Sequence, residues 1–422
     1  MIDVKRIVEN RDEVKQGLLK RMKEEDMHLE EIAQLYEKVK TFQSEYDSKK
    51  AQQNSYNEQM SQLEKGSTEF LKLIEELKEK ASEVKEIENS LKETQKQLNH
   101  LLEVLPNIPD EDVVAGGKEN NEVMETRGEK PTFSFPVKDH LELGESLGIF
   151  DFQTSAKISG NNFIMYKGKG AQLEWALLNY FISTHLKDGY EMILPPHIVN
   201  AQSAYTTGQL PKFRGDVYWV NEDQCLIPTS ETSLTNIYRD EILPESELPK
   251  KLFAYTPCYR KEAGSYRANE RGMIRVHQFN KVEMYQFTSK DKSDEALEEL
   301  LFKAEQLVES LGLHFQRVKL AADDCSQGAS KTYDVEVWIP SMNQYYEVSS
   351  ISNTRDYQAR RGNMRYKPLD GSKPEYMHTL NASGLATSRL MVALVETYQQ
   401  EDGSISIPEA LRPFTGFDKI EA

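Results

Sequence analysis

The N-terminal quarter of the chain carries hydrophobic residues at alternating spacings of three and four. The repeat breaks once, at Lys65-Gly66-Ser67, and then resumes with the same spacing. Its positions are Ile32, Leu35, Val39, Phe42, Tyr46, Lys49, Gln53, Tyr56, Met60 and Leu63, then Phe70, Leu73, Leu77, Val84, Ile87, Leu91, Leu98, Leu101 and Leu105. Two heptad helices joined by one glycine-containing turn must fold back on each other, so the pattern predicts an antiparallel coiled coil over about residues 27–105.

Two further features belong to this arm. A shorter amphipathic helix is predicted ahead of it, over residues 3–22. Within the first long helix, the polar residues Lys49 and Gln53 occupy core positions, which predicts a looser distal half. A heptad run is also typical of dimerisation or plain scaffolding, so the pattern alone assigns the arm no function. Pro106 and Pro109 end the arm.

The remaining chain has a different pattern. Residues 107–133 are polar and rich in Gly, Asn and Glu, which predicts a linker or an extended entry strand. Beyond them we expect helices over 171–185, 294–311 and 389–398 and strands over 190–194, 338–345 and 346–352. There is no regular βαβ rhythm, so the fold class is predicted to be α+β with a mainly antiparallel sheet. The expected domains are 1–106, a linker at 107–133, and 134–422.

Residues 256–287 predict a hairpin whose two faces differ. Side chains two apart share a face of a strand, so Arg260 and Glu262 point the same way. On the return strand, one face carries Arg275, His277, Phe279, Lys281 and Glu283, and the other carries Val276, Val282 and Met284. A polar face turned to water would be a sufficient explanation. Charges of both signs around an aromatic ring instead indicate a ligand with a phosphate, a flat base and an amine. We interpret His277 as structural.

Composition narrows the class of protein. The 422 residues carry a formal net charge of −17, which argues against broad non-specific binding to nucleic acid, DNA included. The three cysteines are far apart and form no CxxC pair, so a disulfide framework is not expected and a reducing, cytoplasmic location fits. No apolar run has the length of a membrane span. Neither usual glycine-rich phosphate loop is present, so a phosphate site must use side chains.

Several segments together resemble a known family. The hairpin resembles motif 2 of the class II aminoacyl-tRNA synthetases, helix 171–185 with Pro195-Pro196 resembles motif 1, and residues 381–389 (NASGLATSR) resemble motif 3. Within that class, residues 207–213 (TGQLPKF), 229–231 (TSE), 347–350 (EVSS) and 356–361 (DYQARR) resemble seryl-tRNA synthetase. The coiled-coil arm ahead of the catalytic domain is typical of the same family. The resemblance covers essentially the whole chain.

The resemblance implies a serine–tRNA ligase that forms seryl-adenylate from ATP and L-serine and then charges tRNA(Ser). In this family tRNA(Sec) is a further expected substrate. It makes Arg260, Glu262 and Arg389 catalytic. The implied ATP-binding residues are Arg260, Lys261, Glu262, Arg275, Phe279, Glu347, Val348, Ser349, Ser350 and Arg389, with Mg²⁺ on Glu347 and Ser350. The implied serine-binding residues are Thr229, Ser230, Glu231, Arg260, Glu283 and Ser383.

The resemblance also implies a homodimer, with motif 1 at its interface, and an arm that holds tRNA. The arm from Met27 to Val104 contains 11 Lys and no Arg against 16 Asp plus Glu, so an anionic partner must find a local basic stripe. The candidates for tRNA binding are Lys38, Lys40, Lys49, Lys50 and, in the motif 2 loop, Arg267.

Some positions depart from the usual family text. The loop at 266–270 differs, Ser230 stands where Ala is usual, Ile351 where Cys is usual, and Ala382 and Ser388 where Gly is usual. Two alternatives therefore stay open. One is a divergent paralogue with the same adenylation chemistry, serving inhibitor resistance or another acceptor. The other is a non-catalytic RNA-binding scaffold that retains the fold.

Overall fold

The computed structural model describes residues 1–262 and 272–421, so the predicted hairpin loop, with Gly264 and residues 266–270, lies outside the described residues. The chain folds as two compact units. One is Ile2–Pro106, and the other runs from Asn107 onward together with Met1. No helix in the described ranges is long and apolar enough to cross a membrane.

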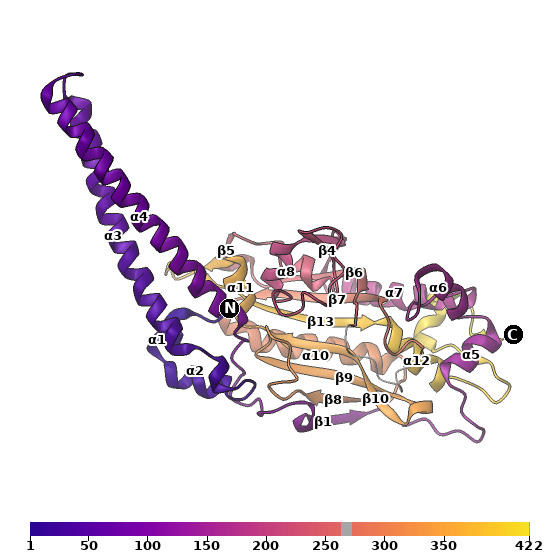
Figure 1. Cartoon of the computed structure of the whole chain (residues 1–422). Helices are drawn as coiled ribbons and strands as arrows, with labels where there is room; N and C mark the ends of the chain where they lie inside the picture. Colours follow the sequence, from indigo (N-terminus) through magenta and orange to yellow (C-terminus); the bar gives the residue numbers. More distant parts are fainter. Residues whose placement is uncertain (263–271, 422) are drawn as a thin grey trace. The chain divides into compact units, whose positions relative to one another are not determined.

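The first unit contains the two predicted long helices, α3 (Leu29–Gln62) and α4 (Thr68–Val104), which pack along each other as a hairpin (Figure 1). The single helix predicted over 3–22 is wrong. The structure has α1 (Val4–Glu9) and α2 (Arg11–Leu18) instead, followed by a 3-10 turn at Glu24–Asp26. The break falls at Asn10, whose backbone (φ −128°, ψ 45°) is not helical, and the side chain of Asp3 caps the first helix.

Burial is uneven along the long helices. The buried positions lie away from the turn between the helices, at Leu29, Ile32, Ala33 and Leu35 at the start of α3 and from Val84 onward, with Thr94, Leu98 and Leu102, on α4. Further out, Lys49 of α3 reaches across to Glu83 of α4, with Nζ 2.7 Å from Oε2. The distal half is therefore held by polar contacts and half-buried side chains, as the polar core positions predicted.

The second unit is built on an eight-stranded sheet in the order β1-β8-β9-β10-β13-β7-β6-β2. Among the described residues of this sheet, β2 and β6 form the one parallel pair, which confirms the predicted α+β class with a mainly antiparallel sheet. The strands are β1 (Glu122–Arg127), β2 (Glu191–Ile193), β6 (Lys250–Tyr259), β7 (Gln278–Thr288), β8 (Phe315–Lys319), β9 (Lys331–Ile339), β10 (Gln344–Asn353) and β13 (His378–Ala386). Smaller sheets pair β3 (Ile198–Asn200) with β4 (Gln224–Leu226), β5 (Ile242–Pro244) with β11 (Arg365–Lys367) and β12 (Glu375–Tyr376), and β14 (Ile405–Ser406) with β15 (Lys419–Ile420).

Helices cover this sheet. The predicted helices correspond to α7 (Lys169–Lys187), α10 (Ser293–Ser310) and α12 (Thr387–Thr397), and their apolar residues share one core with Val282 and Met284 of β7. The others are α5 (His140–Leu147), α6 (Phe152–Ser159), α8 (Ala201–Thr207), α9 (Glu231–Leu234), α11 (Tyr357–Gly362) and α13 (Arg412–Thr415). A second core lies around Tyr285 and Phe287, further along the opposite face of β7.

Three predicted strands have different bounds in the structure. The strand predicted over 338–345 is wrong, because a 3-10 turn at Pro340–Met342 separates β9 from β10. Proline has no N–H for a central ladder, so the turn falls there. The strand predicted over 190–194 is shortened to β2. The return strand of the hairpin begins only at Gln278, so Arg275 and His277 precede it.

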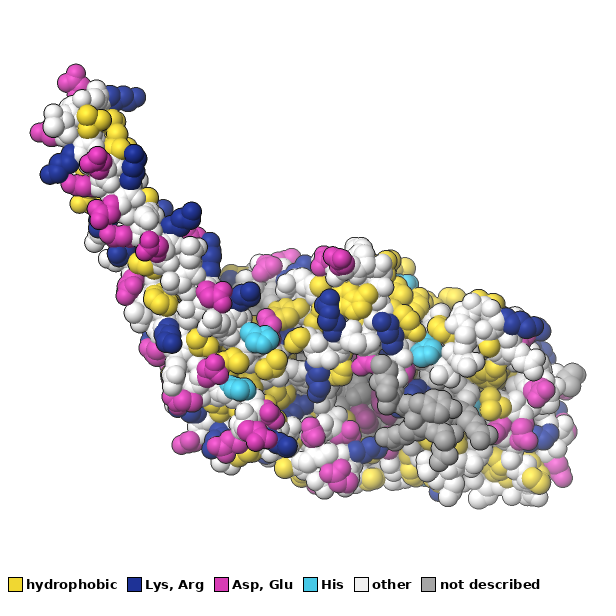
Figure 2. All heavy atoms as spheres, viewed as in Figure 1, with side chains coloured by type: hydrophobic (Ala, Val, Ile, Leu, Met, Phe, Trp, Pro, Cys, Tyr) yellow, Lys and Arg dark blue, Asp and Glu magenta, His cyan; other side chains and the backbone are white. Residues whose placement is uncertain are grey.

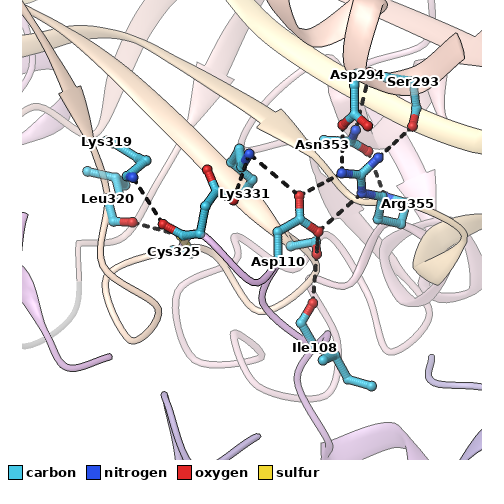
Figure 3. A network of polar contacts seen from close by, with 12 residues as sticks. Ile108, Asp110, Ser293, Asp294, Lys319, Leu320, Cys325, Lys331, Asn353 and Arg355 are labelled. Atoms are coloured by element: carbon cyan, nitrogen blue, oxygen red, sulfur yellow. Dashed lines mark hydrogen bonds and ion pairs between the residues drawn. The ribbon is translucent and has the colours of Figure 1, made fainter. Parts of the chain in front are cut away.

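The first residues of the second unit, from Asn107, are held by polar contacts with distant parts of the same unit; Figure 3 shows those around Asp110 and Arg355. The side-chain amide of Asn107 donates to the carbonyls of Gly328 and Thr354. Asp110 accepts two hydrogen bonds from Arg355, which also contacts Asp294 and the hydroxyl of Ser293. These bonds hold residues 107–110 in place, and β1, an edge strand within 107–133, pairs with β8.

Candidate active site

The hairpin and its neighbours line a pocket whose empty space, including the open solvent at its mouth, is about 540 Å³. The lining residues come from β6–β7, β10, β13 and the start of α12, and most are charged or polar: Arg260, Glu262, Ile274, Arg275, Val276, Phe279, Lys281, Glu347, Val348, Ser383, Ala386, Ser388 and Arg389. Alternation along β7 explains much of this set. Phe279 and Lys281 point into the pocket, while Val282 and Met284 point into the core, as predicted.

Arg260 follows directly after β6 and is fixed at both its backbone and its side chain. Its N–H donates to the carbonyl of His277 (2.9 Å), and its Nε donates to the carbonyl of Pro228 (3.2 Å). The guanidinium carbon lies 5.1 Å from the ring centre of Phe279. The ring of His277 packs against Phe163 and has Nδ1 3.0 Å from the carbonyl of Arg260. His277 thus shapes the hairpin, in agreement with the structural interpretation.

The residues after Arg260 diverge in direction. Glu262 forms an ion pair with Arg275, so both side chains stay at the pocket. Lys261 is exposed and does not line the pocket. Its ammonium lies 5.6 Å from the ring centre of Tyr218, and its backbone N–H donates to the carbonyl of Asp216.

Arg389 lies in the first turn of α12 on the far wall. Its Nε donates to the carbonyl of Ile274 (3.0 Å), and its Nη1 donates to the carbonyl of Glu347 (3.1 Å). The carboxylate of Glu347 is 3.5 Å from the same nitrogen. Because two carbonyls already orient this guanidinium, its remaining donors have a fixed direction for an anion.

A bulge in β10 brings Glu347 and Ser350 to one face. Residues three apart on a regular strand point to opposite faces. Here the register slips between Glu347 and Ser349, so that Glu347 is opposite Glu336 and Ser350 is opposite Asp334 of β9. Since Glu336 and Asp334 are two apart, all four side chains share a face. Burial and the nearby carboxylate of Glu347 raise the pKa of Asp334 well above its usual value.

The predicted serine residues lie at the floor. Ser383 of β13 is opposite Glu283 of β7, and its hydroxyl is 3.4 Å from Glu283 Oε2. The carboxylate Oε1 of Glu231 accepts hydrogen bonds from Gln358 (2.8 Å) and Asn381 (3.0 Å). Burial and the carboxylate of Glu283 raise the pKa of Glu231 to about 7.

The structure places the predicted residues at several positions, with Lys261 outside the pocket lining and Ser350 opposite Asp334 in the β9–β10 pair. The pocket brings together Arg260, Glu262, Arg275, Phe279, Glu347, Val348, Ser383 and Arg389. Thr229, Glu231, Glu283 and Ser349 lie directly behind this lining; for example, Ser349 donates to the carbonyl of Ser383. Ser230 is fully buried with no partner for its hydroxyl in the described ranges. Arg267 lies outside the described residues.

Of the unusual positions with a described structure, only Ser388 lines the pocket. Ile351 and Ala382 are buried in the core. Residues that sequence reasoning did not assign to the site are Lys281, Ile274, Val276, Ala386, Gln358 and Asn381. Lys281 stood on the correct face of the predicted strand, but nothing in the sequence distinguished a buried lysine from an exposed one.

The candidate tRNA-binding lysines all lie on α3. Lys38 and Lys40 are exposed, and Lys40 pairs with Glu37 of its own helix. Lys49 pairs across the arm with Glu83, whereas exposed Lys50 donates to Gln53. Figure 2 shows basic and acidic side chains interspersed along the arm. Lys49 thus has a structural partner, and the others face solvent.

Comparison with known proteins gives full-length matches. Residues 1–109 match the seryl-tRNA synthetase N-terminal domain, and residues 218–398 match the tRNA synthetase class II core domain (G, H, P, S and T). The chain is 52% identical over 427 residues to serine–tRNA ligase 2 of Clostridium acetobutylicum, covering all of both chains. It is 43% identical over 419 residues to serine–tRNA ligase of Geobacter sulfurreducens, covering 99% of both chains.

Solved structures agree. Seryl-tRNA synthetase from Pyrococcus horikoshii complexed with ATP superposes with a TM-score of 0.90 at 32% identity, over 100% of this chain and 99% of that one. Cytoplasmic serine–tRNA ligase from Naegleria fowleri in complex with AMP superposes with a TM-score of 0.85 at 27% identity, with the same coverage.

Proposed function

The chain belongs to the seryl-tRNA synthetase family, and we propose that it activates L-serine with ATP to seryl-adenylate and then transfers serine to the 3′ end of tRNA(Ser). The observation that carries this proposal is the pocket itself. It joins two guanidinium groups held by backbone carbonyls, an aromatic ring, and a floor of carboxylates and hydroxyls. Full-length similarity to serine–tRNA ligases favours this function over the scaffold and the alternative acceptor.

Activation brings the serine carboxylate to the α-phosphate of ATP, so two anions must meet. The Arg260 guanidinium, fixed by Pro228, lowers this repulsion and stabilises the charge that develops at phosphorus. No general base is needed, because an α-carboxylate is already ionised near neutral pH. Arg275, held by Glu262, lies beside the same pocket and contacts the phosphates.

ATP is oriented by the two walls of the pocket. Phe279 stacks on adenine, and Arg389 lies on the opposite side of the base, near the γ-phosphate. Glu262 reaches the adenine amino group. The polar floor is reserved for serine, so the nucleotide and the amino acid meet at Arg260.

Mg²⁺ fits beside Glu347 and Ser350. The bulge supplies hard oxygen donors on one face, and buried Asp334 has an Oδ1 with no partner in the described part of the chain. That part contains no group of three His, Cys, Asp or Glu side chains arranged for a metal ion. Mg²⁺ is usually bound through one or two carboxylates together with substrate phosphates, and Glu347 supplies a carboxylate at the pocket. When bound, the ion neutralises charge on the phosphates and on the pyrophosphate leaving group.

Serine recognition uses the floor. The ammonium of serine binds the carboxylate of Glu231. The hydroxyl of serine binds Glu283 and Ser383, and Thr229 lies beside them. A site that hydrogen-bonds a hydroxyl rejects alanine, because its buried polar groups are then left unpaired.

Transfer requires the single-stranded 3′ end of tRNA to reach this pocket. Lys261, which follows Arg260, lies over the ring of Tyr218, and Lys212 and Arg214 lie over the rings of Phe213 and Trp219. None of the three has an ion-pair partner among residues 1–262 and 272–421. Cations interleaved with aromatic rings bind single-stranded nucleic acid. We assign the 3′ end to this surface and the tRNA body to the arm lysines.

The enzyme acts as a homodimer in the cytoplasm. Motif 1 exposes large apolar side chains: Trp175 and Leu186 of α7, Leu194 after β2 and Ile198 of β3. Four exposed large apolar side chains within 24 residues of sequence support an interface at this motif.

Serine-dependent exchange of pyrophosphate into ATP, followed by charging of purified tRNA(Ser) and tRNA(Sec), tests the proposal. We expect exchange with serine and charging of tRNA(Ser). Absence of exchange would favour the hypothesis of a non-catalytic RNA-binding scaffold. Exchange without charging would favour another acceptor. Arg214→Glu should lower charging while exchange stays at the wild-type rate, and equal loss of both would remove the 3′-end assignment.

A further inference from the structure

One charged residue of the pocket has no role in the chemistry described so far. Lys281 of β7 is only 5% exposed, yet it carries an ammonium to the floor of the pocket. Its Nζ donates to the hydroxyl of Thr229 (2.8 Å) and forms an ion pair with Oε2 of Glu283, which is itself 2% exposed. A buried ammonium is costly unless it is paired and hydrogen-bonded, so its place requires an explanation.

The floor contains two carboxylates that serine could use. Lys281 pairs directly with Glu283, whereas Glu231 is held by the neutral amides of Gln358 and Asn381. Two carboxylates and one ammonium leave the floor with one uncompensated negative charge when both acids are ionised. That charge is matched by the single ammonium of an amino acid. Because Lys281 pairs directly with Glu283, Glu231 carries the uncompensated charge.

The hydrogen bonds of the two carboxylates distinguish Glu231 from Glu283 in the same way. In the described part of the chain, Glu283 has its Oε2 occupied by Lys281 and Ser383, and its Oε1 accepts no hydrogen bond. Glu231 has its Oε1 occupied and its Oε2 open. Each acid therefore offers one oxygen to a ligand, but only Glu231 offers it without a neighbouring counter-charge in direct contact.

Thr229 is oriented by the same lysine. Its Oγ1 accepts from Lys281 and from the backbone N–H of Glu231 (3.2 Å). A hydroxyl has two acceptor positions and one proton, so Thr229 can offer only its proton to a ligand. An ammonium has no lone pair to accept that proton. Thr229 therefore donates to an oxygen atom of the substrate, and Glu231 binds the substrate ammonium.

We infer that Lys281 is a specificity-determining residue: by neutralising Glu283 and orienting Thr229, it keeps the floor's hydroxyl site separate from its ammonium site. The inference rests on the proposed serine activation and deepens it. Without the lysine, two charged carboxylates compete for one ammonium. Serine then loses its defined position, and the hydroxyl no longer decides whether an amino acid is accepted.

The test compares serine and alanine in pyrophosphate exchange by Lys281→Met, Lys281→Arg and wild type. We expect Lys281→Met to raise KM for serine and to lower the serine-to-alanine ratio of kcat/KM by at least about tenfold, with KM for ATP unchanged. Lys281→Arg keeps the charge and should recover part of the ratio. Lys331→Met is the control, because Lys331 is also ion-paired, with a side chain only 15% exposed, but does not line the pocket.

A charge-balanced double variant separates specificity from folding. Glu283→Gln alone leaves the ammonium unpaired and should abolish serine binding. Lys281→Met combined with Glu283→Gln removes both charges and should activate serine better than either single variant. An unchanged serine-to-alanine ratio in Lys281→Met, or a double variant no better than the singles, would overturn the inference. Absence of serine-dependent exchange in wild type would overturn the proposed function instead.

Discussion

The pocket and the arm use charged side chains in opposite ways. In the pocket, Arg260 and Arg389 are held by backbone carbonyls, and Lys281 is held by a buried carboxylate. Along the arm, lysines such as Lys92 pair with acids one turn away on the same exposed helix face. A buried charge is costly without its partner, whereas an exposed pair contributes little and is screened by salt. The pocket is therefore preorganised, and the arm offers an adjustable surface.

The largest effect should follow a change at Arg260. Arg260→Lys keeps a positive charge but loses the planar donors that bridge two anions. We expect serine-dependent pyrophosphate exchange to fall by about 10²–10³-fold, the cost of removing one preorganised donor to a developing charge. Arg239→Lys serves as the control, because Arg239 does not line the pocket and its Nη1 donates to Asn236. If Arg260→Lys kept more than a tenth of the wild-type rate, bidentate contact would not be the source of activation.

A smaller effect should appear in the pH dependence of serine binding. Burial and Glu283 raise the pKa of Glu231 to about 7, while Lys281 and Arg260 act in the opposite direction. Only the ionised carboxylate attracts the serine ammonium, so kcat/KM for serine should rise with pH and level off above 7. Below that value it should fall by about tenfold per pH unit.

Glu231→Gln checks this assignment. The amide cannot ionise, so the variant should have a low and nearly flat profile between pH 5.5 and 8, measured as kcat/KM for serine in pyrophosphate exchange. A profile that still rises near pH 7 would place the titrating group elsewhere.

The same raised pKa means that protonated Glu231 is favoured in the folded state. Its stabilising contribution is therefore present below the unfolded pKa and lost as the pH rises through about 7.

The sequence predicted the parts of the fold that follow periodic patterns. Heptad spacing predicted α3 and α4, and period-two alternation placed Phe279, Lys281 and Glu283 on one face of β7. The bulge at Val348 could not be predicted, because alternation alone would put Glu347 and Ser350 on opposite faces. The break at Asn10 was also missed, since hydrophobic spacing continues across it. Periodicity predicts regular elements, whereas this site depends on irregular positions in β10 and β13, where the register shifts between Glu347 and Ser349 and between Ser383 and Ala386.

A few-fold effect is expected from the surface of the arm. Lys50→Glu reverses an exposed charge that donates a hydrogen bond to Gln53 of the same helix, so the fold should be retained. We expect KM for tRNA in charging to rise by about two- to fivefold at low salt and less at high salt, because a phosphate contact is lost. Pyrophosphate exchange should be unchanged. A variant with unaltered salt dependence of charging would remove Lys50 from the tRNA-binding surface.

The smallest effect should come from the ion pair between the arm helices. Lys49 and Glu83 are each about one-third exposed, at 35% and 31%, so solvent screens their attraction. Lys49→Met should change the free energy of unfolding by less than about 1 kcal/mol, measured by urea denaturation. Lys40→Met, whose pair with Glu37 lies within one helix, is the control for losing an exposed charge. A loss of 3 kcal/mol or more would mean that Lys49 behaves like the buried Lys281, and the contrast between arm and pocket would then fail at this residue.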